Sequence, residues 1–439
     1  MADALGHYLA EAERATASRR DRDPRWMTGA RQDALARFRG LGFPTTRDEE
    51  WRFTSVSSIA ETPFTLAESG ASLVESTDLD RLRLPAGAAA TLVFVNGRPV
   101  ESESDLGRLP ARVRVDSFAG AVAEGRVDVE AHLARVAAMG PRAFTELNTA
   151  FLADGAVVCV PDSCVVDGPI HLLFVSTGGE RPTMAHPRVV VVMGANSQAC
   201  VVESYIGVNA GISLTNAVTE VVAGENARLD HYKLQREGRD TAHVGGMYLR
   251  AARSASIACH SIALGGSLVR NDVLAVLDGE GAECTLNGLY LGDRRMLVDN
   301  HTTIDHAKPH CHSREVYNGI LADRARAVFN GKIVVRPDAQ KTDAKQTNKA
   351  LLLSDEAQIN TKPQLEIFAN DVKCTHGAAI GQMDDEAVFY LRARGLGERE
   401  ARRLLIRAFA GDVLNRLPLT TLAGHLDTEL MNRLPGSYA

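Results

Sequence analysis

Cys374 and His376 are the two side chains whose type and spacing most clearly suggest chemistry. They lie two residues apart in the stretch 366–383, EIFANDVKCTHGAAIGQM, which otherwise has the pattern of a strand. Side chains i and i+2 of a strand point to the same face, so a thiolate and an imidazole here could approach one metal or one partner. The pair also fits a small apolar filler beside a hydrogen-bonded polar residue, and the spacing alone leaves both interpretations open.

A second group of potential ligands lies in the stretch 299–319, DNHTTIDHAKPHCHSREVYNG. Imidazole and thiolate are ligands that zinc and iron prefer, so this group is a weaker candidate for a metal site. Its spacing matches no closed metal motif, and a hydrogen-bonded or interface role fits it better. The candidates are His301, His306, His310, Cys311 and His312.

Other kinds of catalytic equipment are missing from the sequence. It contains no G-x-x-x-x-G-K-[ST], G-x-S-x-G or H-E-x-x-H pattern. The carboxylates at 384–386 stand at the start of an expected helix, where the helix dipole explains them better than glycosidase chemistry does. We therefore expect a protein that is not a stand-alone enzyme.

Composition narrows the partners and the compartment. The net charge is -6 and the 49 basic residues are spread along the chain, which argues against nucleic acid as a main partner. The N-terminus has no signal-peptide pattern, and no apolar run approaches the roughly 18 residues that span a bilayer. The seven cysteines include no C-x-x-C pair, which argues against disulfides and structural zinc. We expect a cytoplasmic protein without a membrane partner.

The middle of the chain, 156–383, predicts a β-solenoid. Short β-branched runs recur there, each followed by a polar turn and a small residue, with almost no helical pattern. Such a repeat buries its apolar face by stacking one coil on the next. An antiparallel sandwich is the alternative. The small residues that we align as equivalent are Ser197, Ala227, Ala255, Ala282, Ala325 and Ala357.

Helical regions are expected on both sides of the solenoid. Residues 1–155 predict a mostly helical domain with some strands, in which the segment 48–55, DEEWRFTS, packs the helices on the next domain. Residues 384–439 predict a helical domain whose second helix carries two different faces. Its polar and apolar candidates for a partner-docking surface are Arg399, Arg403, Arg407 and Phe409, although a solvated face also fits the arginines.

Several long motifs in the second half of the chain resemble the SufB/SufD family of iron-sulfur cluster assembly proteins. They are HTTIDHAKPHCHSREVYNGIL (301–321), FNGKIVVRPDAQKTDAKQTNKALLLS (329–354), the stretch 366–383 and FYLRARGL (389–396). The resemblance is strong over about 160–415 and weak in the N-terminal part, where EEWRF (49–53) is similar. Residues 348–352 read NKALL and lack the thiol of SufB, whereas DVKCTHGA (371–378) looks like SufD.

The resemblance implies a mainly β protein with a right-handed parallel β-helix between two helical domains. It implies a non-catalytic scaffold that pairs with SufB through the β-helix and binds the ATPase SufC, where ATP would be hydrolysed, through the C-terminal helices. His376 would be the SufD side of a transient iron-sulfur cluster shared with SufB, with Cys374 assisting. Whether a flavin binds the complex, and whether the chain forms a homodimer in isolation, is left open. The alternatives are a zinc or other metal-binding protein that uses 301–312, and a β-helix enzyme acting on polysaccharides.

Overall fold

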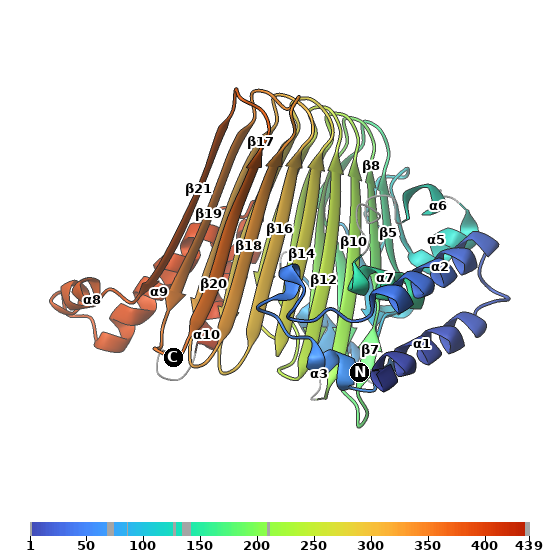
Figure 1. Cartoon of the computed structure of the whole chain (residues 1–439), viewed down its shortest axis with the longest axis horizontal. Helices are drawn as coiled ribbons and strands as arrows, with labels where there is room; N and C mark the ends of the chain where they lie inside the picture. Colours follow the sequence, from blue (N-terminus) through green and yellow to red (C-terminus); the bar gives the residue numbers. More distant parts are fainter. Residues whose placement is uncertain are drawn as a thin grey trace.

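Two long sheets of parallel strands, wound as a solenoid, form the centre of the molecule (Figure 1). The computed structural model describes residues 2–67, 74–85, 87–125, 129–133, 142–208 and 211–434. Within these residues the first sheet, sheet A, runs in the order β20-β18-β16-β14-β12-β10-β8-β5-β4, and sheet B runs β21-β19-β17-β15-β13-β11-β9-β6-β2-β3. Successive strands of the solenoid therefore alternate between the sheets, which confirms the predicted parallel β-solenoid and excludes the sandwich.

The strands of sheet A are β1 (Thr65–Leu66), β4 (Arg114–Ser117), β5 (Gly155–Val160), β7 (Thr183–Ala185), β8 (Arg188–Met193), β10 (Ser213–Ala223), β12 (Thr241–Ala251), β14 (Leu268–Leu277), β16 (Leu297–His306), β18 (Arg326–Val335) and β20 (Gln358–Ile367). The strands of sheet B are β2 (Ala90–Val95), β3 (Arg98–Pro99), β6 (Val165–Ser176), β9 (Gln198–Gly207), β11 (Arg228–Arg236), β13 (Ser256–Ala263), β15 (Glu283–Gly292), β17 (His312–Leu321), β19 (Asp343–Leu352) and β21 (Lys373–Gln382).

The described helices lie before β5 and after β21. They are α1 (Ala2–Ala17), α2 (Arg25–Leu41), α3 (Ser57–Glu61), α4 (Ser76–Leu82), α5 (Phe118–Glu124), α6 (Val129–His132), α7 (Ala143–Phe151), α8 (Asp385–Arg392), α9 (Glu398–Leu414) and α10 (Thr420–Arg433), with the 3-10 helices η1 (Glu49–Trp51) and η3 (Glu101–Glu103). No helix of the described residues is long and apolar enough to cross a membrane. The domain limits at 155 and 383 stay a prediction, since β2 and β4 from the N-terminal part already pair with the solenoid sheets.

The turns between the sheets correct the predicted alignment of the repeat. Asn196, Asn226, Ser254 and Gly281 have positive φ and immediately precede Ser197, Ala227, Ala255 and Ala282, which are all buried before a strand of sheet B. The next two turns of this series have positive φ at His310 and Lys341, so Cys311 and Thr342 are the true equivalents. Ala325 and Ala357 instead precede β18 and β20 at the opposite edge. The alignment is therefore wrong for these two, which explains their irregular spacing.

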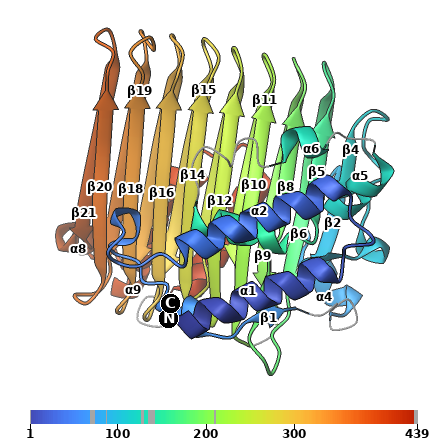
Figure 2. The ribbon, with the colours of Figure 1, turned by 45° about the vertical axis from the view of Figure 1, so that its right-hand side comes forward.

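Helices α1, α2 and α7 cover one outer face of the solenoid, and α9 and α10 cover the opposite face (Figures 1 and 2). Phe144 and Phe151 of α7 pack with the helices α1 and α2 over Leu214 and Val244 of sheet A. Ile406 of α9 and other apolar residues of α9 and α10 pack over sheet B, whose outer face is also apolar. Parallel sheets with both faces covered carry nearly continuous apolar strands, which is why the alternation is weak in the sequence of these strands.

The last coil of the solenoid is uncovered. No residue of β20 or β21 is fully buried, whereas β18 and β19 each contain several buried positions. In Figure 1 β21 lies at the left end of the stack, away from the N-terminal helices. The side chains that point into the solenoid between the two sheets are therefore accessible at this end.

Candidate functional site

Cys374 and His376 lie on β21, at this open end. Their partners in the neighbouring strand β19 are Ala344 and Gln346, which are both buried inside the solenoid. Because register partners in a parallel sheet point to the same face, Cys374 and His376 face the interior of the solenoid and not its outer surface. Cys374 is half-buried and His376 is exposed. The two side chains thus lie on one face of β21 and are accessible at the open end of the solenoid.

The thiol of Cys374 is partly held in the core. It packs against a small apolar cluster that includes Ile333, Val335 and Ala344. Burial raises the pKa of Cys374 above its usual value, so the group is a neutral thiol at neutral pH. As a ligand, Cys374 would have to lose its proton on contact with a metal.

A buried glutamate, Glu315, lies two strands from His376 at the same register position of sheet B. Gln346, the register partner of His376, donates a hydrogen bond of 2.7 Å from Nε2 to the carboxylate of Glu315 on β17. Burial raises the pKa of Glu315 from 4.5 to about 7. Sequence inspection missed Glu315 because nothing in SREVYNG distinguishes an inward from an outward glutamate.

The raised pKa makes the stability of the protein depend on Glu315 in a defined pH window. The folded state prefers the neutral acid, so this stability is present below the unfolded pKa of 4.5 and is lost as pH rises through about 7. The substitution Glu315→Gln keeps an acceptor for Gln346 and removes the ionisation. We expect the variant to gain about 2–3 kcal/mol relative to wild type between pH 5 and pH 8, measured by urea unfolding.

The control for this prediction is Glu283→Gln, which alters an exposed carboxylate at the start of β15. It should follow the wild-type pH dependence. A Glu315→Gln variant that also follows it would show that Glu315 is ionised in the folded protein at pH 5.

The residues of the 301–312 group are not brought together. His306 is buried at the end of β16, 2.9 Å from the hydroxyl of Ser313, and burial lowers its pKa to about 4. His310 is a turn residue, and His312 is exposed at the start of β17. Cys311 is a buried core residue whose Sγ donates to the carbonyl of Gly279 at 3.2 Å. Among the described residues, no three side chains of His, Cys, Asp or Glu form a group that could hold a metal.

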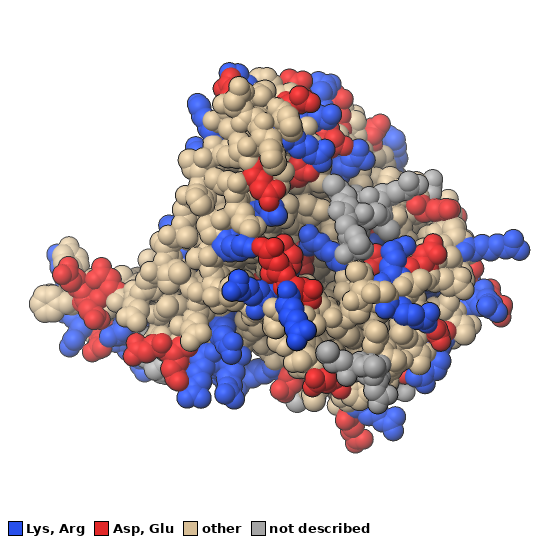
Figure 3. Space-filling view, viewed as in Figure 1, with Lys and Arg blue, Asp and Glu red and all other residues tan. Residues whose placement is uncertain are grey.

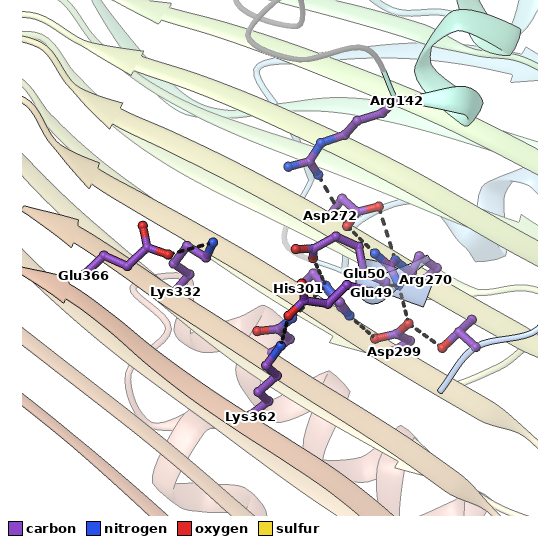
Figure 4. Close-up of polar contacts among 12 residues, drawn as sticks. Glu49, Glu50, Arg142, Arg270, Asp272, Asp299, His301, Lys332, Lys362 and Glu366 are labelled. Atoms are coloured by element: carbon purple, nitrogen blue, oxygen red, sulfur yellow. Dashed lines mark hydrogen bonds and ion pairs between the residues drawn. The ribbon is translucent and has the colours of Figure 1, made fainter. Parts of the chain in front are cut away.

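His301 faces in a different direction from the others. It lies on β16 beneath the segment 48–54, between Glu50 of that segment and Asp299 (Figure 4). The predicted packing of the segment 48–55 on the next domain is confirmed for Trp51, whose ring centre lies 4.0 Å from the guanidinium of Arg270 on β14 of the solenoid. Phe53 instead stays exposed.

The docking candidates on α9 do not share one exposed face. Arg399 is exposed, and Arg407 is exposed but pairs with Asp427 of α10 at 2.7 Å. Arg403 is half-buried. Phe409 is partly buried against the solenoid, where its carbonyl accepts a hydrogen bond from Asn318.

Three other apolar side chains are exposed on the C-terminal helices. Phe389 and Tyr390 of α8 are 72% and 57% exposed, and Leu404 of α9 is 45% exposed. Large apolar side chains that gather at a surface commonly mark a partner interface. Sequence inspection missed Phe389 and Tyr390, although their place in FYLRARGL was a signal, since helical periodicity buries only Val388 in this short helix.

Comparison with known proteins agrees with this architecture. Residues 174–409 match the family model "SUF system FeS cluster assembly, SufBD core domain", and residues 6–172 match the SufBD protein N-terminal region. The chain is similar to an iron-sulfur cluster assembly SufBD family protein of Synechocystis, with 34% identity over 91% of this chain and 89% of the relative. It is also similar to the iron-sulfur cluster assembly protein SufD of Escherichia coli, with 31% identity over 92% of both chains. The chain therefore belongs to the SufBD family of iron-sulfur cluster assembly proteins.

Proposed function

We propose that this chain is a SufD-type scaffold subunit that assembles a transient iron-sulfur cluster together with SufB. The open last coil is the observation that carries the proposal, because it presents Cys374 and His376 on an accessible face where the described part of the chain supplies no complete set of metal ligands. Iron-sulfur clusters take thiolate ligands and, in some sites, imidazole. A partner that supplies the missing ligands would complete a site from which the cluster can leave.

The edge formed by β20 and β21 is the proposed SufB interface. Between Lys373 and Asp384 the sequence carries no charged residue, and Ile380 of β21 is exposed. Figure 3 shows few charged side chains along the left edge of the stack, where Figure 1 places β21. The unpaired edge of β21, which carries no charged residue between Lys373 and Asp384, is the kind of surface on which a second chain can add its own strands.

The C-terminal helices are the proposed SufC interface. The exposed Phe389 and Tyr390 of α8 and Leu404 of α9 give this region apolar anchors, which carry most of the binding energy in many interfaces. Arg399 and Arg403 of the same region would lie at the polar rim. ATP hydrolysis would belong to SufC, and the scaffold itself would be non-catalytic.

Co-expression with SufB and SufC under anaerobic conditions tests both interfaces. We expect the chain to retrieve both partners, and the double substitution Phe389→Asp/Tyr390→Asp to lose SufC while keeping SufB. Charging two anchors should cost at least about 2 kcal/mol of binding, roughly thirtyfold in affinity. The readout is the ratio of the three chains after purification, followed by calorimetry with SufC.

Phe53→Asp is the matched control for the SufC interface, because Phe53 is an exposed aromatic residue that lies outside the C-terminal helices. It should retain both partners. If a chain ending at residue 383 still retrieves SufC, the interface does not lie on the C-terminal helices. If the intact chain retrieves neither partner and carries no iron or sulfide, the proposed scaffold function itself is wrong.

A further inference from the structure

Gln346 of β19 lies inside the solenoid with only one of its two amide atoms in use. The side chain is buried, and its Nε2 donates a hydrogen bond of 2.7 Å to Oε2 of Glu315 on β17. The amide oxygen Oε1 is buried as well, but no group of the described residues donates to it. A buried acceptor without a donor is unfavourable, so the donors that could reach Oε1 are informative.

The orientation of this amide is fixed from two sides. Oε2 of Glu315 can accept from Nε2 in both protonation states, because a protonated carboxyl keeps one carbonyl oxygen. Gly331 of β18 lies on the other side, where an added Cβ atom would come within 2.1 Å of Nε2 of Gln346. The missing side chain at position 331 therefore leaves the room that the amide occupies. Oε1 stays available for a donor from another strand.

His376 is the next side chain on this face of sheet B. Register pairing puts His376 of β21 directly beside Gln346, on the side away from Glu315. Neighbouring strands lie about 4.8 Å apart, so an imidazole and an amide on the same face are within reach of one hydrogen bond. The imidazole is exposed, and β21 is the last strand of sheet B in the described residues. It can therefore turn a ring N–H toward Oε1.

We propose that Gln346 positions His376 for metal binding by accepting a hydrogen bond from one ring N–H at Oε1. A neutral imidazole has one N–H and one lone pair, so a fixed N–H leaves the lone pair of the other nitrogen available for a metal. Metal-binding histidines usually donate their second nitrogen to a carbonyl or carboxylate oxygen in this way. Glu315 in turn holds the amide of Gln346. The inference rests on the proposed function, in which His376 binds the nascent iron-sulfur cluster.

The tautomer of His376 tests the proposal in the isolated full-length chain, without metal. Long-range ¹H–¹⁵N spectra of the protein labelled at histidine, recorded at pH 8.5, separate the two ring nitrogens, and His376→Gln identifies the signal of His376. His312, which is also exposed, serves as the internal reference. A hydrogen bond of ordinary strength should make the tautomer ratio of His376 differ from that of His312 by about threefold or more.

Three variants separate positioning from a structural role. Gln346→Leu removes both amide atoms and should return the tautomer ratio of His376 to that of His312. Gln346→Glu keeps an acceptor oxygen at this position and should retain the wild-type ratio. Glu315→Gln keeps an acceptor for Nε2 of Gln346 and should retain the ratio as well. Circular dichroism shows whether each variant is folded, and the wild-type ratio decides the question even if Gln346→Leu does not fold.

Cluster content gives the second readout. In the complex with SufB and SufC, Gln346→Leu should lower iron and sulfide about twofold to threefold without changing the ratio of the three chains, whereas Gln346→Glu should not. A wild-type His376 with the tautomer ratio of His312, or a ratio that Gln346→Leu leaves unchanged, would overturn the positioning role. A wild-type complex without iron and sulfide would instead contradict the proposed scaffold function, while the tautomer ratio would still decide whether Gln346 holds the imidazole.

Discussion

The substitution Arg270→Ala is expected to lower the free energy of unfolding by about 3–5 kcal/mol, because it removes the buried cation that binds two buried carboxylates. Arg270 is fully buried on β14, where its guanidinium binds Asp272 at 2.9 Å and Asp299 at 2.6 Å. It also donates to the carbonyl of Glu50 at 2.8 Å and lies 4.0 Å from the centre of the Trp51 ring. One side chain thus connects sheet A to residues 48–54.

Arg270 also lowers the pKa of the neighbouring Asp272. Burial alone would raise the pKa of Asp272, but the guanidinium of Arg270 and that of Arg142 hold it at about 2. Without Arg270, Asp272 and Asp299 must either take up protons or stay charged in the core. We therefore expect loss of stability together with faster amide hydrogen exchange in residues 48–54, measured by urea unfolding and mass spectrometry.

Arg250→Ala is the matched control for this prediction. Arg250 binds Asp278 at 2.6 Å, but both side chains are largely or partly exposed. A pair of this kind contributes about 0–1 kcal/mol. Equal losses in the two variants would mean that burial does not set the strength of the Arg270 network. Unchanged hydrogen exchange in residues 48–54 would mean that Arg270 does not hold this segment.

His376→Ala is expected to reduce the iron and sulfide content of the complex with SufB and SufC several-fold, without altering the ratio of the three chains. The side chain is exposed on β21, so its removal creates no cavity in the core. Loss of one ligand from a site shared by two chains should weaken cluster retention and leave the apolar strand edge intact. Iron and sulfide are measured after anaerobic co-purification, together with the visible absorption of the cluster.

Two comparisons isolate the role of His376. His312→Ala removes another exposed histidine of sheet B and should leave the cluster content unchanged. Cys374→Ser should have the smaller effect of the two strand positions, because burial keeps its thiol protonated. Normal iron and sulfide loading in His376→Ala would remove the ligand role assigned to it.

The solenoid could be predicted from the sequence because each coil needs a similar turn, and similar turns select similar residues. A positive φ at Asn196 or Asn226, followed by a small buried residue, leaves the pattern of a polar turn and then Ser or Ala. The pattern fails where the same requirement is met by unusual residues. His310 and Cys311 occupy such a turn, and their residue types suggested metal chemistry instead.

The candidate sites show the same division between local and long-range information. The i, i+2 spacing correctly placed Cys374 and His376 on one strand face, since that relation is local. The contact of Glu50 with His301 joins residues 251 positions apart in the chain and left no trace in spacing or motif. Likewise, the exposure of Phe389 depends on how α8 lies relative to the solenoid, which periodicity does not define.

Because the last coil is uncovered, register partners on neighbouring strands differ in burial. Ala350 of β19 and Ile380 of β21 are register partners, yet Ala350 is buried and Ile380 is 48% exposed. A charge at Ala350 would have to leave water whenever the chain folds, whereas a charge at Ile380 would stay hydrated in the isolated protein. Positions that are buried in the other coils are therefore surface positions in the last coil. Natural variation there can change which partner the protein binds without changing whether the chain folds.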